Sequence, residues 1–154
     1  AKSLGGGFPI GAMIATSEVA KHLVVGTHGS TYGGNPLACA VANATLEYVS
    51  QKSVLEGVAE RSAMIMEALH KINDQYKCFE DIRGKGMLIG AELTDELKGR
   101  SRELMKIALG HGVMCLVAGP DVMRFTPSLV ITKEDIEQGM AGFAHAVKDI
   151  CQNS

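Results

Sequence analysis

The sequence has no tryptophan and only 5% aromatic residues, so aliphatic side chains and eight methionines must fill its core. Cysteine is sparse too, and its four copies form no C-x-x-C pair: they are Cys39, Cys78, Cys115 and Cys151. This spacing indicates neither a zinc site nor a disulfide framework, and it favours free cytosolic thiols. The five histidines show no metal-ligand spacing, so no metal is expected.

An excess of one charge is also absent. The net charge is -2, and acidic and basic residues are interspersed, which argues against nucleic acid as a partner. No apolar run approaches the length of a membrane span, and no segment resembles a signal peptide. With 154 residues, 46% of them hydrophobic, the chain can bury a substantial core in one or two small domains.

Two glycine-rich segments carry residues suited to cofactor chemistry. Lys2 lies just before Gly5-Gly6-Gly7, and Ser30 and Thr31 lie in the turn at 29–34. A lysine amine condenses with a carbonyl as a Schiff base, and hydroxyl and backbone N–H groups bind phosphate. Pyridoxal 5'-phosphate, with its aldehyde and phosphate, needs this pairing. Taken singly, these residues have plainer interpretations, as a solvated lysine, a flexible turn and two capping residues.

Four segments in order give a more specific indication, and they cover the chain from its beginning to its last third. They are 1–12, 28–38, 82–90 and 122–130, which read AKSLGGGFPIGA, HGSTYGGNPLA, IRGKGMLIG and VMRFTPSLV. Together they resemble the motifs of class III (ornithine-type) aminotransferases. The resemblance implies a transaminase that moves the δ-amino group of N-acetylornithine or succinylornithine to 2-oxoglutarate, giving glutamate in arginine metabolism.

The resemblance also implies an α/β architecture, the fold-type I fold of pyridoxal phosphate transferases. On this interpretation 1–52 is the end of the large cofactor-binding domain, 53–76 a bridging helix and 77–154 a small C-terminal α+β domain. Family members are expected to be cytoplasmic homodimers that share their active sites across the subunit interface. Small amino acids and 2-oxo acids are the expected partners.

Roles for individual residues follow from the same match. Lys2 corresponds to the lysine that holds the cofactor, and its freed amine then moves a proton during the reaction. Ser30 and Thr31 correspond to the hydroxyl pair that reaches the cofactor phosphate of the partner subunit. Arg124 corresponds to an arginine that binds a substrate α-carboxylate and, in ornithine-type members, alternates with a glutamate. From the sequence alone, a charge in the apolar run at 122–127 also fits a buried structural ion pair.

The chain begins within the lysine motif, so we expect it to be the C-terminal portion of a longer protein. The family's glycine-rich phosphate loop, stacking aromatic residue and pyridine-facing aspartate would lie upstream, and the 154 residues alone are expected to be inactive. Alternatives are ornithine or 4-aminobutyrate aminotransferase, a same-fold aminomutase, and a non-catalytic dimerisation fragment.

Apolar periodicity predicts the elements that carry these residues. Asn35 and Pro36 are typical of a helix start, and Thr132 with Asp135 resembles a cap for a last helix that buries Ile136, Met140, Phe143, Val147 and Ile150. The other expected helices are a turn at 17–22 and the segments 37–49, 53–76 and 100–110. The expected strands are 11–16, 79–83, 86–93, 113–117 and 122–125. The segment Arg83 to Gly86 is interpreted as a tight turn rather than a phosphate site.

Overall fold

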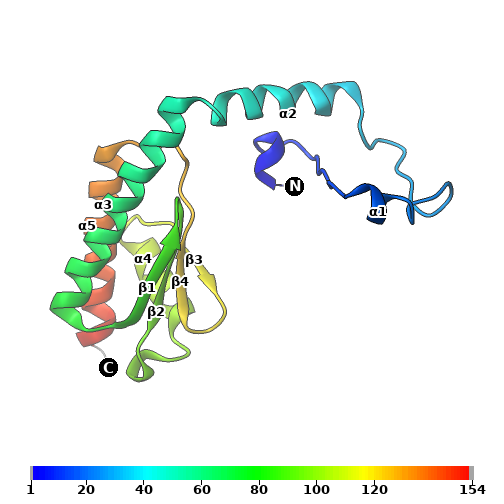
Figure 1. Ribbon diagram of the computed structural model, residues 1–154. Coiled ribbons are helices and arrows are strands. Elements are labelled where there is room, and N and C mark those ends of the chain that lie inside the picture. The colour runs from blue at the N-terminus through cyan, green and yellow to red at the C-terminus, as the bar shows by residue number, and fades with distance from the viewer. Residues whose placement is uncertain (1, 153–154) are drawn as a thin grey trace. The chain divides into compact units, whose positions relative to one another are not determined.

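The computed structural model describes residues 2–152, and the chain forms two compact units divided between Lys52 and Ser53 (Figure 1). We call residues 1–52 the first unit and residues 53–154 the second unit. Their assignment to a large and a small domain, with a bridging helix, stays a prediction. No helix within residues 2–152 is both long enough and apolar enough to cross a bilayer.

The first unit contains the short helices η1 (Lys2–Gly5) and α1 (Ser17–Ala20) and the longer helix α2 (Pro36–Val49). The predicted start of α2 is confirmed, since Asn35 Oδ1 accepts a hydrogen bond from the Ala38 backbone N at 2.9 Å and Pro36 occupies the first turn. Helix η1 packs against α2, where Ala38 and Ala42 are buried. Small side chains at these positions allow the close approach of the two backbones.

The strand expected at 11–16 is wrong, because this segment has no regular structure. Met13 is 75% exposed and Ile14 is 98% exposed, and no strand among residues 2–152 pairs with them. A strand is stabilised by hydrogen bonds to a neighbouring strand, so an apolar run without such a neighbour does not form one. The expected helical turn follows as α1, capped where Thr16 Oγ1 accepts from the Val19 N at 3.4 Å.

The second unit packs three helices against a four-stranded antiparallel sheet. In chain order it contains α3 (Lys52–Tyr76, whose first residue belongs to the first unit), β1 (Phe79–Lys85), β2 (Leu88–Leu93), η2 (Asp95–Leu97), α4 (Ser101–Gly110), β3 (Leu116–Ala118), β4 (Val122–Phe125) and α5 (Lys133–Gln152). The strand order is β1-β2-β4-β3. Figure 1 shows α3 and α5 running side by side, with the sheet next to them.

One apolar cluster joins α3, α4, α5 and the inner face of the sheet. Phe143 of α5 stands at its centre, fully buried, with its ring 6.3 Å from that of Phe79 and 5.0 Å from that of Phe125. The predicted α5 face is confirmed, because Ile136, Met140, Phe143, Val147 and Ile150 are all buried. The helical period therefore identified the buried side of α5 correctly.

The predicted cap of α5 is confirmed as well. Thr132 Oγ1 donates to Asp135 Oδ2 at 2.8 Å and accepts from the Asp135 N at 3.1 Å. The remaining strands and helices agree with expectation except at their ends. Strand β3 begins at Leu116 rather than at residue 113, and β2 begins at Leu88 because Gly86 and Met87 form the turn of the β1–β2 hairpin.

Candidate active site

Lys2 lies at the start of η1, exposed and in an unusual backbone conformation. Its φ of 61° is in the left-handed region, which residues with a Cβ rarely adopt and which costs about 1 to 3 kcal/mol. Gly6 and Gly7 follow with φ of 56° and 109°, where glycine carries little penalty. The strain at Lys2 is typical of residues positioned for chemistry.

Ser30 and Thr31 lie in an exposed turn that is tied to the start of α2. The Ser30 Oγ accepts a hydrogen bond from the Gly33 N at 2.9 Å, and a Cβ on Gly33 would lie only 2.9 Å from the Ser30 Cβ. Asn35 Nδ2 donates to the Tyr32 carbonyl at 2.8 Å, which fixes the turn against the helix cap. No hydrogen bond within residues 2–152 involves the Thr31 hydroxyl. The turn thus contains one hydroxyl that shapes it and a second one, on the exposed Thr31, that has no hydrogen bond within residues 2–152.

Arg124 lies in β4, opposite Gly90 of β2 and Leu116 of β3. Its neighbours Met123 and Phe125 face the apolar cluster, so by strand alternation Arg124 belongs to the outer face of the sheet. Its Nε is buried and has no hydrogen-bond partner. Within residues 2–152 no carboxylate pairs with Arg124, which counts against the structural ion pair considered from the sequence. A buried guanidinium nitrogen without a partner is costly and is suited to an anionic ligand.

Arg124 also lines a cavity of about 420 Å³ at the carboxyl end of β4. The cavity walls are mostly apolar and include Met114, Leu116, Ile131 and Met140. Asp135 also lines it, but its carboxylate accepts the hydrogen bond from Thr132 described above.

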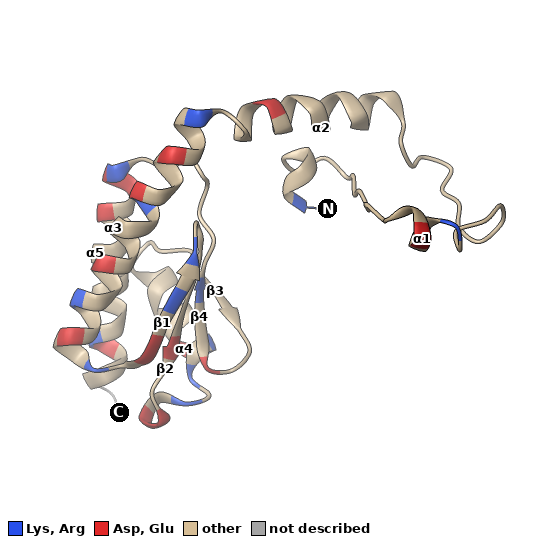
Figure 2. Ribbon diagram, viewed as in Figure 1, with Lys and Arg blue, Asp and Glu red and all other residues tan. Residues whose placement is uncertain are grey.

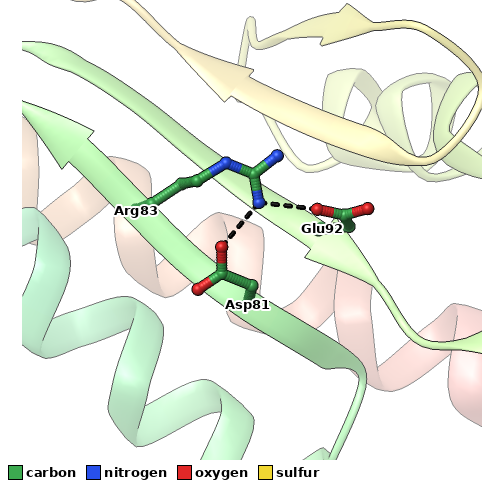
Figure 3. Close-up of polar contacts among 3 residues, drawn as sticks. All are labelled: Asp81, Arg83 and Glu92. Carbon is green, nitrogen blue, oxygen red and sulfur yellow. Dashed lines mark hydrogen bonds and ion pairs between the residues drawn. The ribbon is translucent and has the colours of Figure 1, made fainter.

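A charged cluster on the outer sheet face was not foreseen from the sequence. Arg83 of β1 donates through one guanidinium nitrogen to Asp81 Oδ2 and Glu92 Oε2, both at 2.6 Å (Figure 3). The hydrogen bond to Asp81, and then the one to Glu92, raise the pKa of Arg83 above its ordinary value. The interpretation of Arg83 to Gly86 as a tight turn is wrong for Arg83, Gly84 and Lys85, which pair with β2 as part of β1. Gly86 and Met87 alone form the turn of the hairpin, because the strand pairing continues to Lys85 and Leu88. Glu92 meets Arg83 only through strand register, for which the sequence carries no local signal.

The four predicted site residues divide between the units, with Lys2, Ser30 and Thr31 in the first and Arg124 in the second. No hydrogen bond or ion pair within residues 2–152 joins Lys2 to Ser30 or Thr31. Their joint role in one site therefore stays a prediction.

Elsewhere charges of both signs are interspersed along α3 and α5 (Figure 2).

Comparison with known proteins gives consistent results. The family model described as "Aminotransferase class-III" matches residues 1–147. An acetylornithine aminotransferase of Vibrio cholerae is 55% identical over 147 residues, which are 96% of this chain and 36% of that protein. A succinylornithine transaminase/acetylornithine aminotransferase of Pseudomonas aeruginosa is also 55% identical over 147 residues, again 96% of this chain and 36% of that protein.

A solved structure shows the same fold. The N-acetylornithine aminotransferase of Stenotrophomonas maltophilia superposes with a TM-score of 0.86 at 36% identity, over 98% of this chain and 39% of that one. The fold predicted from the sequence is confirmed by this likeness. The chain spans little more than a third of the length of the proteins that it matches.

Proposed function

The chain belongs to the class-III aminotransferase family, and on that premise we propose that it serves amino-group transfer from an acylated ornithine to 2-oxoglutarate. N-acetylornithine and succinylornithine are the proposed donors, because the relatives at 55% identity carry both names. Glutamate is the proposed product, in arginine metabolism. The proposal applies to the complete enzyme, by which we mean a protein of the relatives' full length that contains this chain.

The observation that carries the proposal is the Arg124 guanidinium, whose buried Nε has no partner. Every substrate proposed here is an amino or oxo acid, and each carries a carboxylate that must be held while a different bond reacts. An arginine fork binds a carboxylate through two parallel hydrogen bonds and so fixes its orientation. Arg124 is the proposed clamp for the α-carboxylate of glutamate and 2-oxoglutarate.

Pyridoxal 5'-phosphate is the proposed cofactor, and when bound it supplies the electron sink that stabilises a carbanion next to the substrate nitrogen. The exposed Lys2 amine fits its aldehyde, and the hydroxyls of the Ser30–Thr31 turn fit its phosphate. We assign to the Lys2 amine the removal and return of the proton at the amine-bearing carbon. Ser30 and Thr31 are assigned to the phosphate held by the partner subunit, in a cytoplasmic homodimer.

The test of the proposal is the half-reaction of the complete enzyme with glutamate. Arg124→Lys keeps the positive charge and loses the planar fork, so kcat/KM for glutamate should fall about tenfold or more while the melting temperature stays nearly unchanged. Arg102→Lys, an exposed arginine of α4, is the matched control and should leave both quantities unchanged. A lower melting temperature with normal glutamate kinetics would instead assign Arg124 to a structural ion pair and reject the clamp.

We also propose that residues 1–154 alone do not turn over substrate. The residues assigned above supply an amine, hydroxyls and a guanidinium, but none of them stacks on the pyridine ring or pairs with its nitrogen. Incubation of the 154-residue chain with cofactor, N-acetylornithine and 2-oxoglutarate tests this directly. Steady glutamate formation at rates of about 1 per second or more, typical of an enzyme, would contradict it.

A further inference from the structure

Gly90 occupies the centre of the outer sheet face, directly beside Arg124. It lies in β2, opposite Arg83 of β1 on one side and Arg124 of β4 on the other. Directly opposed residues of antiparallel strands share a face, with Cβ atoms about 4.5 to 5.5 Å apart. The neighbours Ile89 and Ala91 are fully buried on the inner face, which assigns Gly90 to the outer face with Arg124.

The backbone constrains Gly90 less than it constrains the two preceding glycines. Gly84 has no room for a Cβ, which would lie 2.7 Å from the Leu88 carbonyl oxygen, and Gly86 has a φ of 57° in the hairpin turn. Gly90 has neither a positive φ nor a clash with backbone: a Cβ would lie 3.3 Å from the Val122 Cγ1, a tight contact that requires Val122 to shift by a few tenths of an ångström. Glycine within a strand is less stable than a residue with a side chain, and it often marks the close approach of a ligand.

Arg83, Gly90 and Arg124 form one cross-strand row on the outer face, and the charges of this row indicate which ligand approaches. Of its two arginines, Arg83 is already bound by Asp81 and Glu92, whereas Arg124 has no carboxylate partner within residues 2–152. A carboxylate that lies flat over Gly90 therefore meets one unsatisfied guanidinium. The two acidic side chains on the other side of the row repel it from Arg83.

We propose that Gly90 is a specificity-determining residue: its missing side chain leaves the space through which the α-carboxylate of glutamate or 2-oxoglutarate reaches Arg124. The inference rests on the proposed function, because it assumes that Arg124 binds this carboxylate. A branched side chain at position 90 would occupy that space and exclude the carboxylate. The Arg124 side chain itself would remain intact.

The test uses the complete enzyme and two measurements. The first is the dissociation constant of glutarate, an unreactive dicarboxylate, by titration calorimetry. The second is the pair of half-reactions with glutamate and with N-acetylornithine, whose carboxylate lies far from its reacting amine. Gly90→Val should raise the glutarate dissociation constant and the glutamate KM about tenfold or more, the effect of losing one charge-assisted hydrogen bond. The N-acetylornithine half-reaction should change much less.

Ala118→Val is the matched control, because it adds the same branched bulk to the outer face in the row of Val122 rather than that of Arg124. It should leave glutarate binding unchanged, and equal losses in both variants would overturn the proposal. Unchanged glutarate binding in Gly90→Val would overturn the proposal too. A Gly90→Val protein that fails to fold would also overturn it, because it would show that packing against Val122 requires this glycine. Arg124→Gln distinguishes a failure of the proposed carboxylate clamp from a failure of the proposed role of Gly90. If it leaves glutarate binding intact, the clamp fails and Gly90 with it; if it weakens binding while Gly90→Val does not, only the role of Gly90 is rejected.

Discussion

At the scale of single residues, the sequence indicates chemical types but not their surroundings. Lysine, serine, threonine and arginine stand in recognisable motifs, so the candidates were identifiable without a structure. The left-handed backbone of Lys2 and the unpartnered Nε of Arg124 were not predictable from the sequence. Both depend on the three-dimensional surroundings of the residue, which a sequence motif does not specify. One of the two partners of Arg83 is a further example, since Glu92 reaches it across a hairpin.

Lys2 is expected to be indispensable for turnover. In the complete enzyme, Lys2→Ala removes the amine that holds the cofactor and transfers the proton, so single-turnover transamination should fall to background. Lys21→Ala, which removes an exposed amine that forms an ion pair with Glu18, is the control and should keep full activity. The measurement is glutamate formation followed by rapid quench. Wild-type turnover in Lys2→Ala would reject the assignment.

Thr31 and Ser30 are expected to differ in their effects on cofactor binding. Thr31→Val removes a hydroxyl with no hydrogen bond inside the described chain, and one hydrogen bond to a charged phosphate oxygen is worth roughly 1.5 to 3 kcal/mol. Cofactor affinity should therefore fall about tenfold or more, as measured by absorbance titration of the complete enzyme. Ser30→Ala also removes the acceptor for the Gly33 N and should loosen the turn.

Thr27→Val is the matched control for this pair of variants. Its hydroxyl donates to the Val24 carbonyl at 2.7 Å, so the change removes a threonine hydroxyl outside the predicted phosphate turn. Cofactor affinity should stay at the wild-type value. An equal loss in Thr27→Val and Thr31→Val would show that the segment tolerates no change of this kind, and it would remove the evidence for a phosphate contact.

At the scale of elements, helices were predictable because their stabilising pattern is local. The apolar period of α5 and the caps at Asn35 and Thr132 lie within a few residues of the bonds that they form. Strands were predictable only where a neighbour exists. The apolar run at 11–16 matches a strand in composition, but its pairing would require a distant segment that the pattern does not reveal.

The junction between α3 and β1 depends on one side chain, Asn73. Its Nδ2 donates to the Phe79 carbonyl at 2.9 Å, and its Oδ1 accepts from the Phe79 N at 2.8 Å. Lys77, between them, has a φ of 51°, a conformation usual for glycine after a helix. No sequence signal distinguishes this asparagine from an ordinary surface residue.

Asn73→Ala should lower the free energy of unfolding by roughly 1 to 3 kcal/mol, since two hydrogen bonds to partly buried backbone groups are lost. Urea denaturation followed by circular dichroism measures the change. Asp74→Ala is the control, because Asp74 forms only an exposed ion pair with Lys77 and its removal should alter stability by less than about 0.5 kcal/mol. Equal stability of the two variants would contradict the role of Asn73.

At the scale of the whole molecule, the second unit contains a continuous apolar cluster, and two of its thiols are buried. Burial raises the pKa of Cys78 to about 12, with a smaller contribution from Cys151, and burial raises the pKa of Cys115 to about 11. The sequence predicted free thiols, and all four cysteines are free. It did not predict which of them are inaccessible, because burial depends on how the elements pack.

These thiols should make the fold sensitive to alkali. A buried thiol whose pKa is raised above the unfolded value of about 8.5 to 9 contributes its full stabilisation at pH values below about 8.5. This contribution is lost as the pH rises toward 11 and 12, because the unfolded thiol then ionises more readily than the buried one. Each pH unit across this range lowers the free energy of unfolding by about 1.4 kcal/mol per buried thiol. Urea denaturation of the 154-residue chain at pH 8 and at pH 10.5 measures the loss. The double variant Cys78→Ala with Cys115→Ala should show a smaller loss, and an unchanged pH dependence would contradict the assignment.

The order β1-β2-β4-β3 leaves β1 at one outer edge of the described sheet. Unpaired strand edges are templates on which other chains add, and this is a common start of fibrous aggregation. Four of the seven residues of β1 are charged, namely Glu80, Asp81, Arg83 and Lys85, and the opposite edge, β3, is only three residues long. Charge on one edge and shortness on the other protect the sheet from growing into a fibril.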